Sequence, residues 1–193
     1  MSRTAKLLAV VGGLLVLIVA ATIVLLNRGP DKDGPETKSY FQPAESMEPL
    51  ISAGEHFEAE VVDDYAPQRG DVIVFEDPGG WLGPDSDDFL VKRVIGIPGD
   101  TIVCCDEDGR LEINGEPQDE SAYIEMSEID CAGPMIGTCV WTAGPVPEDG
   151  LFVMGDNRAN SADSSFHLCP VAAEDCDSDA AYVPTDLVRA VVK

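Results

Sequence analysis

FLVKRVIGIPGD, residues 89–100, is a run of apolar and β-branched side chains that ends in a Pro-Gly turn and contains two basic residues, Lys92 and Arg93. Such a run, bounded by turn formers, predicts a β-strand with buried side chains. Side chains alternate across a strand, so one of the two basic residues is expected to point toward apolar neighbours. The chain has five lysines, and Lys92 is the only one between residues 39 and 192.

Similar short runs lie on both sides of this segment and are separated by Gly, Pro, Asp and Asn. They are DVIVFE (71–76), TIVCC (101–105), LEI (111–113), LFVM (151–154) and LVRAVVK (187–193). Asn114-Gly115, directly after LEI, is typical of a two-residue hairpin turn. The pattern predicts an all-β domain of coiled antiparallel sheets. Segments 77–88 and 118–150, rich in Gly, Pro and acidic residues, are interpreted as insertions or long loops.

An apolar stretch without charge or proline occupies the 20 residues 7–26. A helix of this length, at about 1.5 Å per residue, spans the hydrocarbon core of a bilayer, which is about 30 Å thick. The stretch is longer than the core of a cleaved signal peptide, and no small-residue cleavage site follows it. We therefore predict a cytoplasmic tip with one N-terminal transmembrane helix in residues 1–28, a linker in 29–39 and an extracytoplasmic domain in 40–193.

All six cysteines follow the apolar stretch, and none forms a C-x-x-C pair typical of zinc sites. Their even number suits an oxidising compartment, so we predict disulfides, no metal, and a single-pass protein of the cell membrane with its domain outside. Adjacent cysteines rarely bond to each other, so Cys104 and Cys105 are each expected to pair elsewhere. The connectivity is otherwise left open. The disulfide candidates are Cys104, Cys105, Cys131, Cys139, Cys169 and Cys176.

Acidic residues dominate the chain from residue 39 onward, with 33 Asp and Glu against 7 Lys and Arg, a difference of −26. Such a surface repels phosphate backbones, which argues against nucleic acid as a partner. We interpret the acidity as a solubility feature.

A lysine among apolar neighbours has a pKa below its usual value of about 10.4, and a neutral amine is a general base. Lys92 taken alone also fits an edge-strand lysine whose amine reaches water. A serine that it could activate lies in FQPAESMEPLI (41–51), where Pro43 and Pro49 favour a rigid turn around Ser46. Serine–lysine pairs are a known variant of serine-based acyl transfer.

The polar loop GDNRANSADSS (155–165) follows the strand LFVM. It does not fit an EF-hand, because Ser161 and His167 occupy the positions of the required Gly and Glu. The loop is either a solvated connection or a group of side chains that orients Lys92.

These motifs together resemble the type I signal peptidases. SMEP (46–49) matches the nucleophile box, RGDVIVF (69–75) the second box, KRVIGIPGD (92–100) the lysine box and GDNRANSADS (155–164) the last box. Four boxes in the family's order make the resemblance specific, and it covers the apolar stretch and most of residues 41–165. It implies a membrane-anchored β-domain, in contact with the lipid bilayer, that cleaves signal peptides from exported preproteins without metal or cofactor.

The resemblance also implies roles for individual residues. Ser46 is then the nucleophile and an oxyanion donor through its backbone N–H, Lys92 the general base, and Ser161 a hydrogen-bond partner that positions the Lys92 amine. The residues expected to support this dyad and hold the last loop are Asp156, Arg158, Asp163 and Arg93. The substrate is expected to add a strand to the sheet, with small side chains at −1 and −3. The expected pocket residues are Pro43, Ala44, Met47, Ile51, Leu90 and Val91.

The sequence departs from the family pattern at several positions. Ala44 stands where some members have a serine whose hydroxyl adds to the oxyanion hole, and Leu50-Ile51 replaces the usual Thr-Leu. Ser165 stands where an arginine often follows the last aspartate. Lys92 together with GDNR indicates the bacterial type. Segment 166–182 is not explained by the common core, and Cys169 and Cys176 are expected to staple it.

Other functions fit parts of the sequence. A Ser-His-Asp hydrolase would use His56 or His167, and self-cleaving repressor proteases share the serine–lysine chemistry but act in the cytosol. A specialised peptidase for one exported substrate, and a non-catalytic acidic surface module on a membrane anchor, both remain alternatives. The oligomeric state stays open.

Overall fold

The chain folds into antiparallel β-sheets, which confirms the predicted all-β class. The structure, a computed structural model, describes residues 34–83, 88–124, 131–132, 139–169 and 178–193. The predicted transmembrane helix at 7–26 and part of the predicted linker lie outside these ranges. None of the helices in the described ranges is long and apolar enough to cross a bilayer. Residues Thr37–Lys193 form one unit, so the first strand includes the last three residues of the linker predicted for 29–39.

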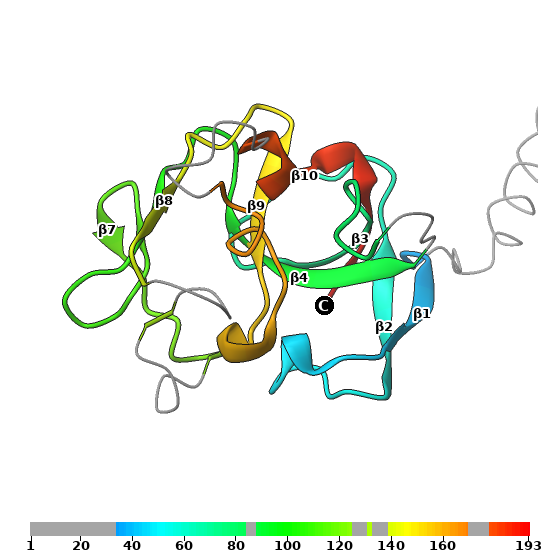
Figure 1. The fold of residues 1–193 in the computed structure, drawn as a ribbon. Helices are drawn as coiled ribbons and strands as arrows, with labels where there is room; N and C mark the ends of the chain where they lie inside the picture. The colour runs from blue at the N-terminus through cyan, green and yellow to red at the C-terminus, as the bar shows by residue number, and fades with distance from the viewer. Residues whose placement is uncertain (1–33, 84–87, 125–130, 133–138, 170–177) are drawn as a thin grey trace, which may run out of the picture. The chain divides into compact units, whose positions relative to one another are not determined.

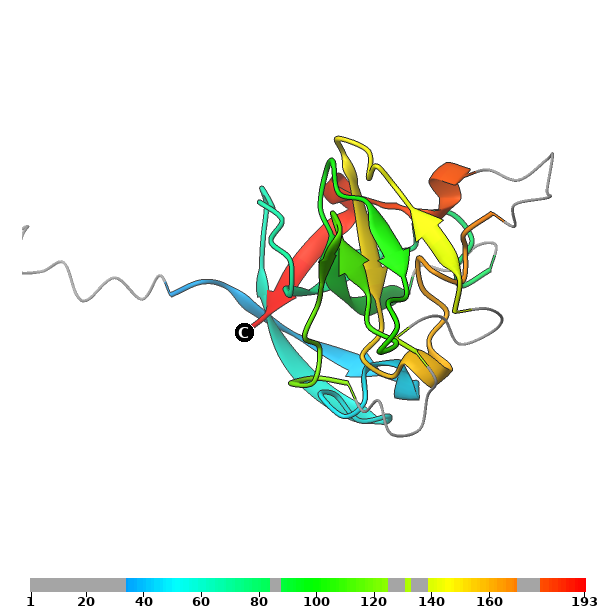
Figure 2. The same cartoon turned by 90° about the vertical axis from the view of Figure 1, so that its left-hand side faces the viewer.

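The larger sheet has seven strands in the order β1-β2-β11-β3-β4-β9-β10, and Figure 1 labels six of them. Its strands are β1 (Thr37–Gln42), β2 (Glu55–Val61), β3 (Val72–Glu76), β4 (Phe89–Gly96), β9 (Gly150–Met154), β10 (Val183–Pro184) and β11 (Val188–Val192). Strand β11, red in Figure 2, runs beside β2, which is cyan, and pairs with β3 on its other side. This late strand therefore joins the β1–β2 pair to the rest of the sheet.

The smaller sheet has four strands in the order β7-β6-β5-β8. Its strands are β5 (Ile102–Cys104), β6 (Glu112–Ile113), β7 (Glu116–Pro117) and β8 (Trp141–Ala143). Asn114 and Gly115 join β6 to β7 with φ angles of 54° and 81°, so the predicted two-residue hairpin is confirmed. Strand β8 lies inside segment 118–150, which we had interpreted as an insertion or long loop. Residues 141–143 of that segment belong to the sheet instead, since β8 pairs with β5.

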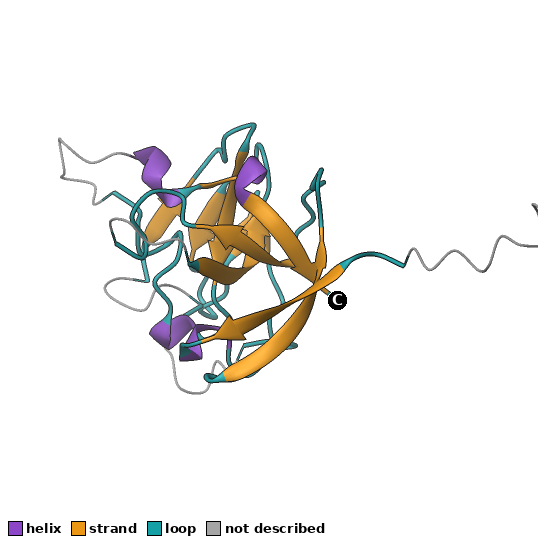
Figure 3. Cartoon of the chain, turned by 90° about the vertical axis from the view of Figure 1, so that its right-hand side faces the viewer, coloured by secondary structure: helices purple, strands orange, loops and turns teal. Residues whose placement is uncertain are grey.

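Helical structure in the described ranges is confined to short 3₁₀ turns, purple in Figure 3. These are η1 (Glu45–Met47), η3 (Arg158–Asn160), η4 (Ser178–Ala181) and η5 (Thr185–Leu187). Two of them, η1 and η3, carry the nucleophile box and the last box. Both motifs therefore sit on turns outside the strands.

Strand β4 lies between β3 and β9 and is buried along nearly its whole length. This explains its almost continuous apolar sequence, because a central strand covered on both faces has no solvent side to fill with polar residues. Leu90 and Val94 pack in one hydrophobic cluster, and Val91 packs in another. The orientation of β4, and with it the position of Lys92, is therefore fixed, because rotating the strand would expose its apolar side chains to solvent.

The turn after β4 is fixed by an ion pair between two of the sequence boxes. Arg69 donates from Nε to Asp100 Oδ2 over 2.7 Å. Asp100 also accepts the backbone N–H of Ile97 and the side-chain amide of Asn114, each at 2.9 Å. Burial opposes the charge of Asp100, but these donors outweigh it and hold the pKa of the carboxyl below its usual value. Arg69 of the second box and Asp100 of the lysine box are therefore structural partners.

Candidate active site

Ser46 lies in the 3₁₀ turn η1, directly after β1, and its side chain is buried. The neighbouring Met47 is fully buried in the cluster that contains Val91, so the turn is anchored to the core on the side of β4. The carbonyl of Ser46 accepts the backbone N–H of Asn157 at 3.1 Å. The Asn157 side chain in turn donates to the carbonyl of Glu45 at 3.2 Å. Turn η1 is thus held between the core and the last box.

Lys92 extends from β4 to the hydroxyl of Ser46, and its Nζ lies 2.8 Å from Ser46 Oγ. The amine also donates to the carbonyl of Val91 at 3.1 Å. In the part of the chain that the structure describes, no carboxylate forms an ion pair with Lys92. Burial lowers the pKa of Lys92 from 10.5 to about 8, and the charges of Asp163 and Asp156 oppose this decrease. A substantial neutral fraction is therefore available at mildly alkaline pH.

Arg93, the next residue of β4, forms an ion pair with Asp156. Its Nε and Nη2 donate to the two carboxylate oxygens at 2.7 and 2.6 Å, and its guanidinium lies 4.1 Å from the ring centroid of Tyr123. The negative charge of Asp156 is thereby balanced by the guanidinium of Arg93 rather than by Lys92. The predicted contact between Arg93 and an aspartate of the last box is present at Asp156.

Asp163 is buried and accepts four hydrogen bonds. One oxygen accepts the Gly155 N–H at 3.0 Å and the Ser161 hydroxyl at 2.6 Å, and the other accepts the N–H and hydroxyl of Ser165 at 3.1 and 2.6 Å. Ser165, which replaces the arginine expected here, thus binds the aspartate through its own polar groups. Among the described residues no cation forms an ion pair with Asp163, so these hydrogen bonds hold the loop around it.

The predicted hydrogen bond between Ser161 and Lys92 is absent from the described structure, where the Lys92 amine bonds Ser46 and Val91 and the Ser161 hydroxyl donates to Asp163. Ser161 packs against Gly155, where an added Cβ would lie 2.3 Å from the carbonyl oxygen of Ser46 and 2.4 Å from Ser161 Oγ. No Cβ fits at such distances, so Gly155 is required for the last box to approach η1 this closely. The sequence motif contains this glycine, but its packing role was not predicted.

Arg158 is fully buried and pairs with Glu120 through two nitrogens. It also donates to the carbonyls of Gly155 and Ala132. Glu120 accepts the Tyr123 hydroxyl at 2.7 Å as well. Sequence analysis missed Glu120, since it lies in the segment interpreted as an insertion and carries no local signal of burial.

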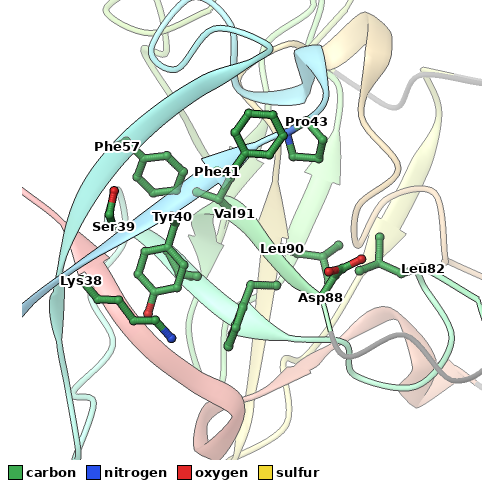
Figure 4. A pocket seen from close by; sticks show the side chains of 12 residues that line it. Lys38, Ser39, Tyr40, Phe41, Pro43, Phe57, Leu82, Asp88, Leu90 and Val91 are labelled. Atoms are coloured by element: carbon green, nitrogen blue, oxygen red, sulfur yellow. The ribbon is translucent and has the colours of Figure 1, made fainter.

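A groove of about 440 Å³ lies between β1 and the first half of β4 (Figure 4). Its lining residues are Lys38, Ser39, Tyr40, Phe41, Pro43, Phe57, Val74, Leu82, Asp88, Phe89, Leu90 and Val91. Strand β1 is the edge of the larger sheet, and β9 pairs with β4 only from Arg93 onward. In the described ranges, β1 and the first half of β4 therefore each have one side without a neighbouring strand.

Three of the six predicted pocket residues, Pro43, Leu90 and Val91, line this groove. Ala44 is exposed beside it. Met47 and Ile51 are buried in the adjoining hydrophobic cluster and are not among the lining residues.

A family model for "Signal peptidase, peptidase S26" matches residues 9–183. The chain belongs to this family. It is 34% identical over 177 residues to signal peptidase I of Mycobacterium tuberculosis (strain ATCC 25618 / H37Rv), covering 72% of this chain and 58% of that protein. It is also 37% identical to signal peptidase I of Leptolyngbya laminosa (65% and 58% covered) and 34% identical to signal peptidase I P of Bacillus subtilis subsp. natto (78% and 79%). The chain thus spans somewhat over half the length of the first two relatives.

Among solved structures, a signal peptidase I from Enterococcus faecalis V583 matches with 26% identity and a TM-score of 0.41. The match covers 67% of this chain and 98% of that one.

The cysteines of this family member pair differently from our expectation. Cys104 and Cys105 are bonded to each other, which corrects the prediction that each pairs elsewhere, and Cys131 is bonded to Cys139. The sulfurs of Cys104, Cys105 and Cys131 lie within 4.8 Å of one another, but all three are in disulfides. Cys169 is disulfide-bonded too, while its predicted partner Cys176 lies outside the described residues.

Neither histidine of this signal peptidase homologue contacts Ser46. His56 is exposed and packs on Phe41, and His167 stacks on Trp81 with 4.5 Å between ring centroids. In the described ranges, the side-chain partners of the Ser46 hydroxyl are Lys92 and Gln42. The arrangement therefore favours a serine–lysine pair over a Ser-His-Asp triad.

Proposed function

We propose that this protein is a membrane-anchored serine endopeptidase that removes signal peptides from exported preproteins, with Ser46 as nucleophile and Lys92 as general base. The observation that carries the proposal is the 2.8 Å contact between Lys92 Nζ and Ser46 Oγ in a buried site. The lowered pKa of Lys92 supports it, because only the neutral amine can accept the serine proton. Family membership supports the substrate class.

In this mechanism the Lys92 amine first loses its charge, and the Ser46 hydroxyl then donates its hydrogen bond to Nζ instead of accepting one from it. Neutral Nζ accepts the hydroxyl proton while Oγ bonds to the carbonyl carbon of the scissile peptide, and the electron pair of the C=O bond moves to its oxygen. The Lys92 ammonium then gives the proton to the leaving nitrogen as the C–N bond breaks. Water, deprotonated by Lys92, hydrolyses the acyl-enzyme and restores Ser46.

The substrate is proposed to lie extended in the groove between β1 and β4. Its backbone would pair with the free edges of both strands, and Pro43, Leu90 and Val91 would contact small side chains at −1 and −3. Residues 7–26, apolar and uncharged, are proposed as a single-pass anchor that keeps the domain at the extracytoplasmic surface of the cell membrane.

Cleavage of a preprotein by the detergent-solubilised full chain tests the proposal. Ser46→Ala and Lys92→Ala should each lower kcat/KM at least about 10³-fold, because each removes one half of the reacting pair. Ser52→Ala, at an exposed serine six residues further on, should retain full activity as a matched control. Activity that survives Lys92→Ala would place the base elsewhere. Cleavage of only one preprotein from a panel would indicate the specialised peptidase.

A further inference from the structure

Gln42 is a buried polar residue on the apolar side of β1. Tyr40 and Gln42 share the inward face of the strand, and Gln42 is 4% exposed. Tyr40 packs with Met47, Ile51 and Val91 in one hydrophobic cluster. An amide placed here without a partner would cost about 1–3 kcal/mol, so an apolar side chain would be the better choice for stability alone.

The hydrogen bond that the structure gives the Gln42 amide leads to the nucleophile. Its Nε2 donates to Ser46 Oγ over 3.4 Å, whereas Lys92 Nζ lies 2.8 Å from the same oxygen. A distance of 3.4 Å is long for such a bond. Donors that serve a reaction are often loosely placed before substrate binds and tighten afterwards.

The position of this donor suits the oxygen that becomes charged during acyl transfer. When Ser46 Oγ bonds to the substrate carbonyl carbon, the developing oxyanion lies on that same carbon, next to Oγ. A buried N–H donor beside Oγ is then within reach of the new charge, and such donors stabilise it most strongly where water is excluded. Ala44, with a methyl side chain, supplies no side-chain donor.

We propose that the side-chain amide of Gln42 is a catalytic oxyanion donor that acts together with the backbone N–H of Ser46. This inference rests on the proposed function, since it requires a tetrahedral intermediate on Ser46. It adds no reactant and moves no proton: the amide N–H transfers its hydrogen bond from Oγ to the oxyanion and returns when the intermediate collapses.

A purely structural role for Gln42 makes a different prediction, because the amide would then only hold the rotamer of Ser46. Gln42→Glu separates the two roles. A carboxylate of the same shape can still hydrogen-bond the serine hydroxyl, but it repels an oxyanion. Gln42→Met fills the same space with neither a donor nor a charge.

The experiment measures kcat and KM for Gln42→Met and Gln42→Glu on the plateau of each variant's pH profile, where Lys92 is neutral in both. We expect Gln42→Met to lower kcat about 100-fold with KM changed less than about threefold, and Gln42→Glu to lower kcat further. Gln68→Met, at an exposed glutamine, is the matched control and should leave both constants unchanged. Thermal unfolding of each variant verifies that it folds, and Gln42→Leu replaces Gln42→Met if that variant does not.

A peptide aldehyde provides a second readout, because its adduct with Ser46 carries the charged oxygen without turnover. Gln42→Met should weaken its binding about 100-fold, while binding of the uncleaved peptide in a Ser46→Ala background should not change. Wild-type kcat in Gln42→Met, or more activity in Gln42→Glu than in Gln42→Met, would overturn the inference alone. Turnover by Ser46→Ala would instead overturn the proposed function.

Discussion

Lys92 and Arg158 are both buried cations, and their surroundings differ in one respect. Arg158 has a carboxylate, Glu120, in direct contact, whereas no carboxylate forms an ion pair with Lys92 in the described ranges. Burial opposes the charge of both residues. At Arg158 the Glu120 charge and hydrogen bonds outweigh burial and the pKa is raised, while at Lys92 burial prevails and the pKa falls to about 8.

We expect this difference to separate a structural cation from a reactive one. A buried cation with a hydrogen-bonded carboxylate keeps its charge and fixes the segments that it joins. A buried cation without one can lose its proton near physiological pH and then accept another. The two kinds lie on different elements here, Arg158 in η3 and Lys92 in β4. The next four experiments test whether this difference determines their roles.

Exchanging the cation type at Lys92 should have the largest effect. A guanidinium stays protonated at every practical pH, so Lys92→Arg cannot act as a base. We expect kcat/KM for preprotein cleavage to fall at least about 10³-fold at all pH values. Arg110→Lys, at an exposed basic residue in the turn between β5 and β6, should cleave like the wild type. Retained activity in Lys92→Arg would mean that the neutral amine is not the base.

Removing the carboxylate from Arg158 should have the next largest effect. Glu120→Gln leaves a buried guanidinium without its counter-charge, which should lower the free energy of unfolding by about 3–5 kcal/mol. Urea denaturation followed by circular dichroism measures this loss, with Glu116→Gln at an exposed position as the control. An unchanged midpoint would show that Arg158 needs no charged partner.

A smaller effect is expected in the pH dependence of stability. The pKa of Lys92 is lower in the folded state than in the unfolded chain, so the folded state carries the cost of a buried charge below pH 8, and the cost disappears between about pH 8 and 10.5. Lys92→Met removes this cost. Its stability relative to the wild type should therefore be about 3 kcal/mol more favourable at pH 6 than at pH 10.5. The stability difference between Lys92→Met and the wild type is measured by unfolding at both pH values. The same difference at pH 6 and pH 10.5 would contradict the lowered pKa.

The smallest effect should come from the charge of Asp163, which raises the pKa of Lys92. Asp163→Asn should move the alkaline rise of kcat/KM to lower pH, by about half a pH unit. The measurement is the pH profile of cleavage, because a merely structural loss would lower the plateau without moving the midpoint. Asp186→Asn, an exposed aspartate, should leave the midpoint at its wild-type position.

Local patterns explain what could be predicted of the fold. Strands β3, β4, β9 and β11 are central or well covered, so their apolar sequences were sufficient to predict them. Strands β1 and β2 were missed, because they lie at the exposed edge. The sequence EHFEAEV of β2 has a single fully buried side chain, Ala59, and no clear alternation. Exposed strands of this kind are recognised by their pairing, which is not local.

The candidate site divides in the same way. Ser46, Lys92 and the last box were predicted because each belongs to a contiguous motif. Glu120 reaches the site from a segment with no motif, and only the folded chain brings it to Arg158. Gln42 lies four residues before Ser46 but outside the box SMEP, so no motif marked it. The prediction that Cys104 and Cys105 pair elsewhere was wrong, because it rested on the general rarity of bonds between adjacent cysteines.

Strand β11 has a consequence for the order of assembly. It joins the β1–β2 pair, which leads to Ser46, to the β3–β4 pair, which carries Lys92. During synthesis, more than 100 residues separate β3 from β11, so the facing edges of β2 and β3 remain unpaired until residues 188–192 leave the ribosome. A nascent chain can therefore form either half of the serine–lysine pair, but it cannot hold the halves in register. The contact between Ser46 and Lys92 is in this way postponed until β11 has left the ribosome and paired with both neighbours.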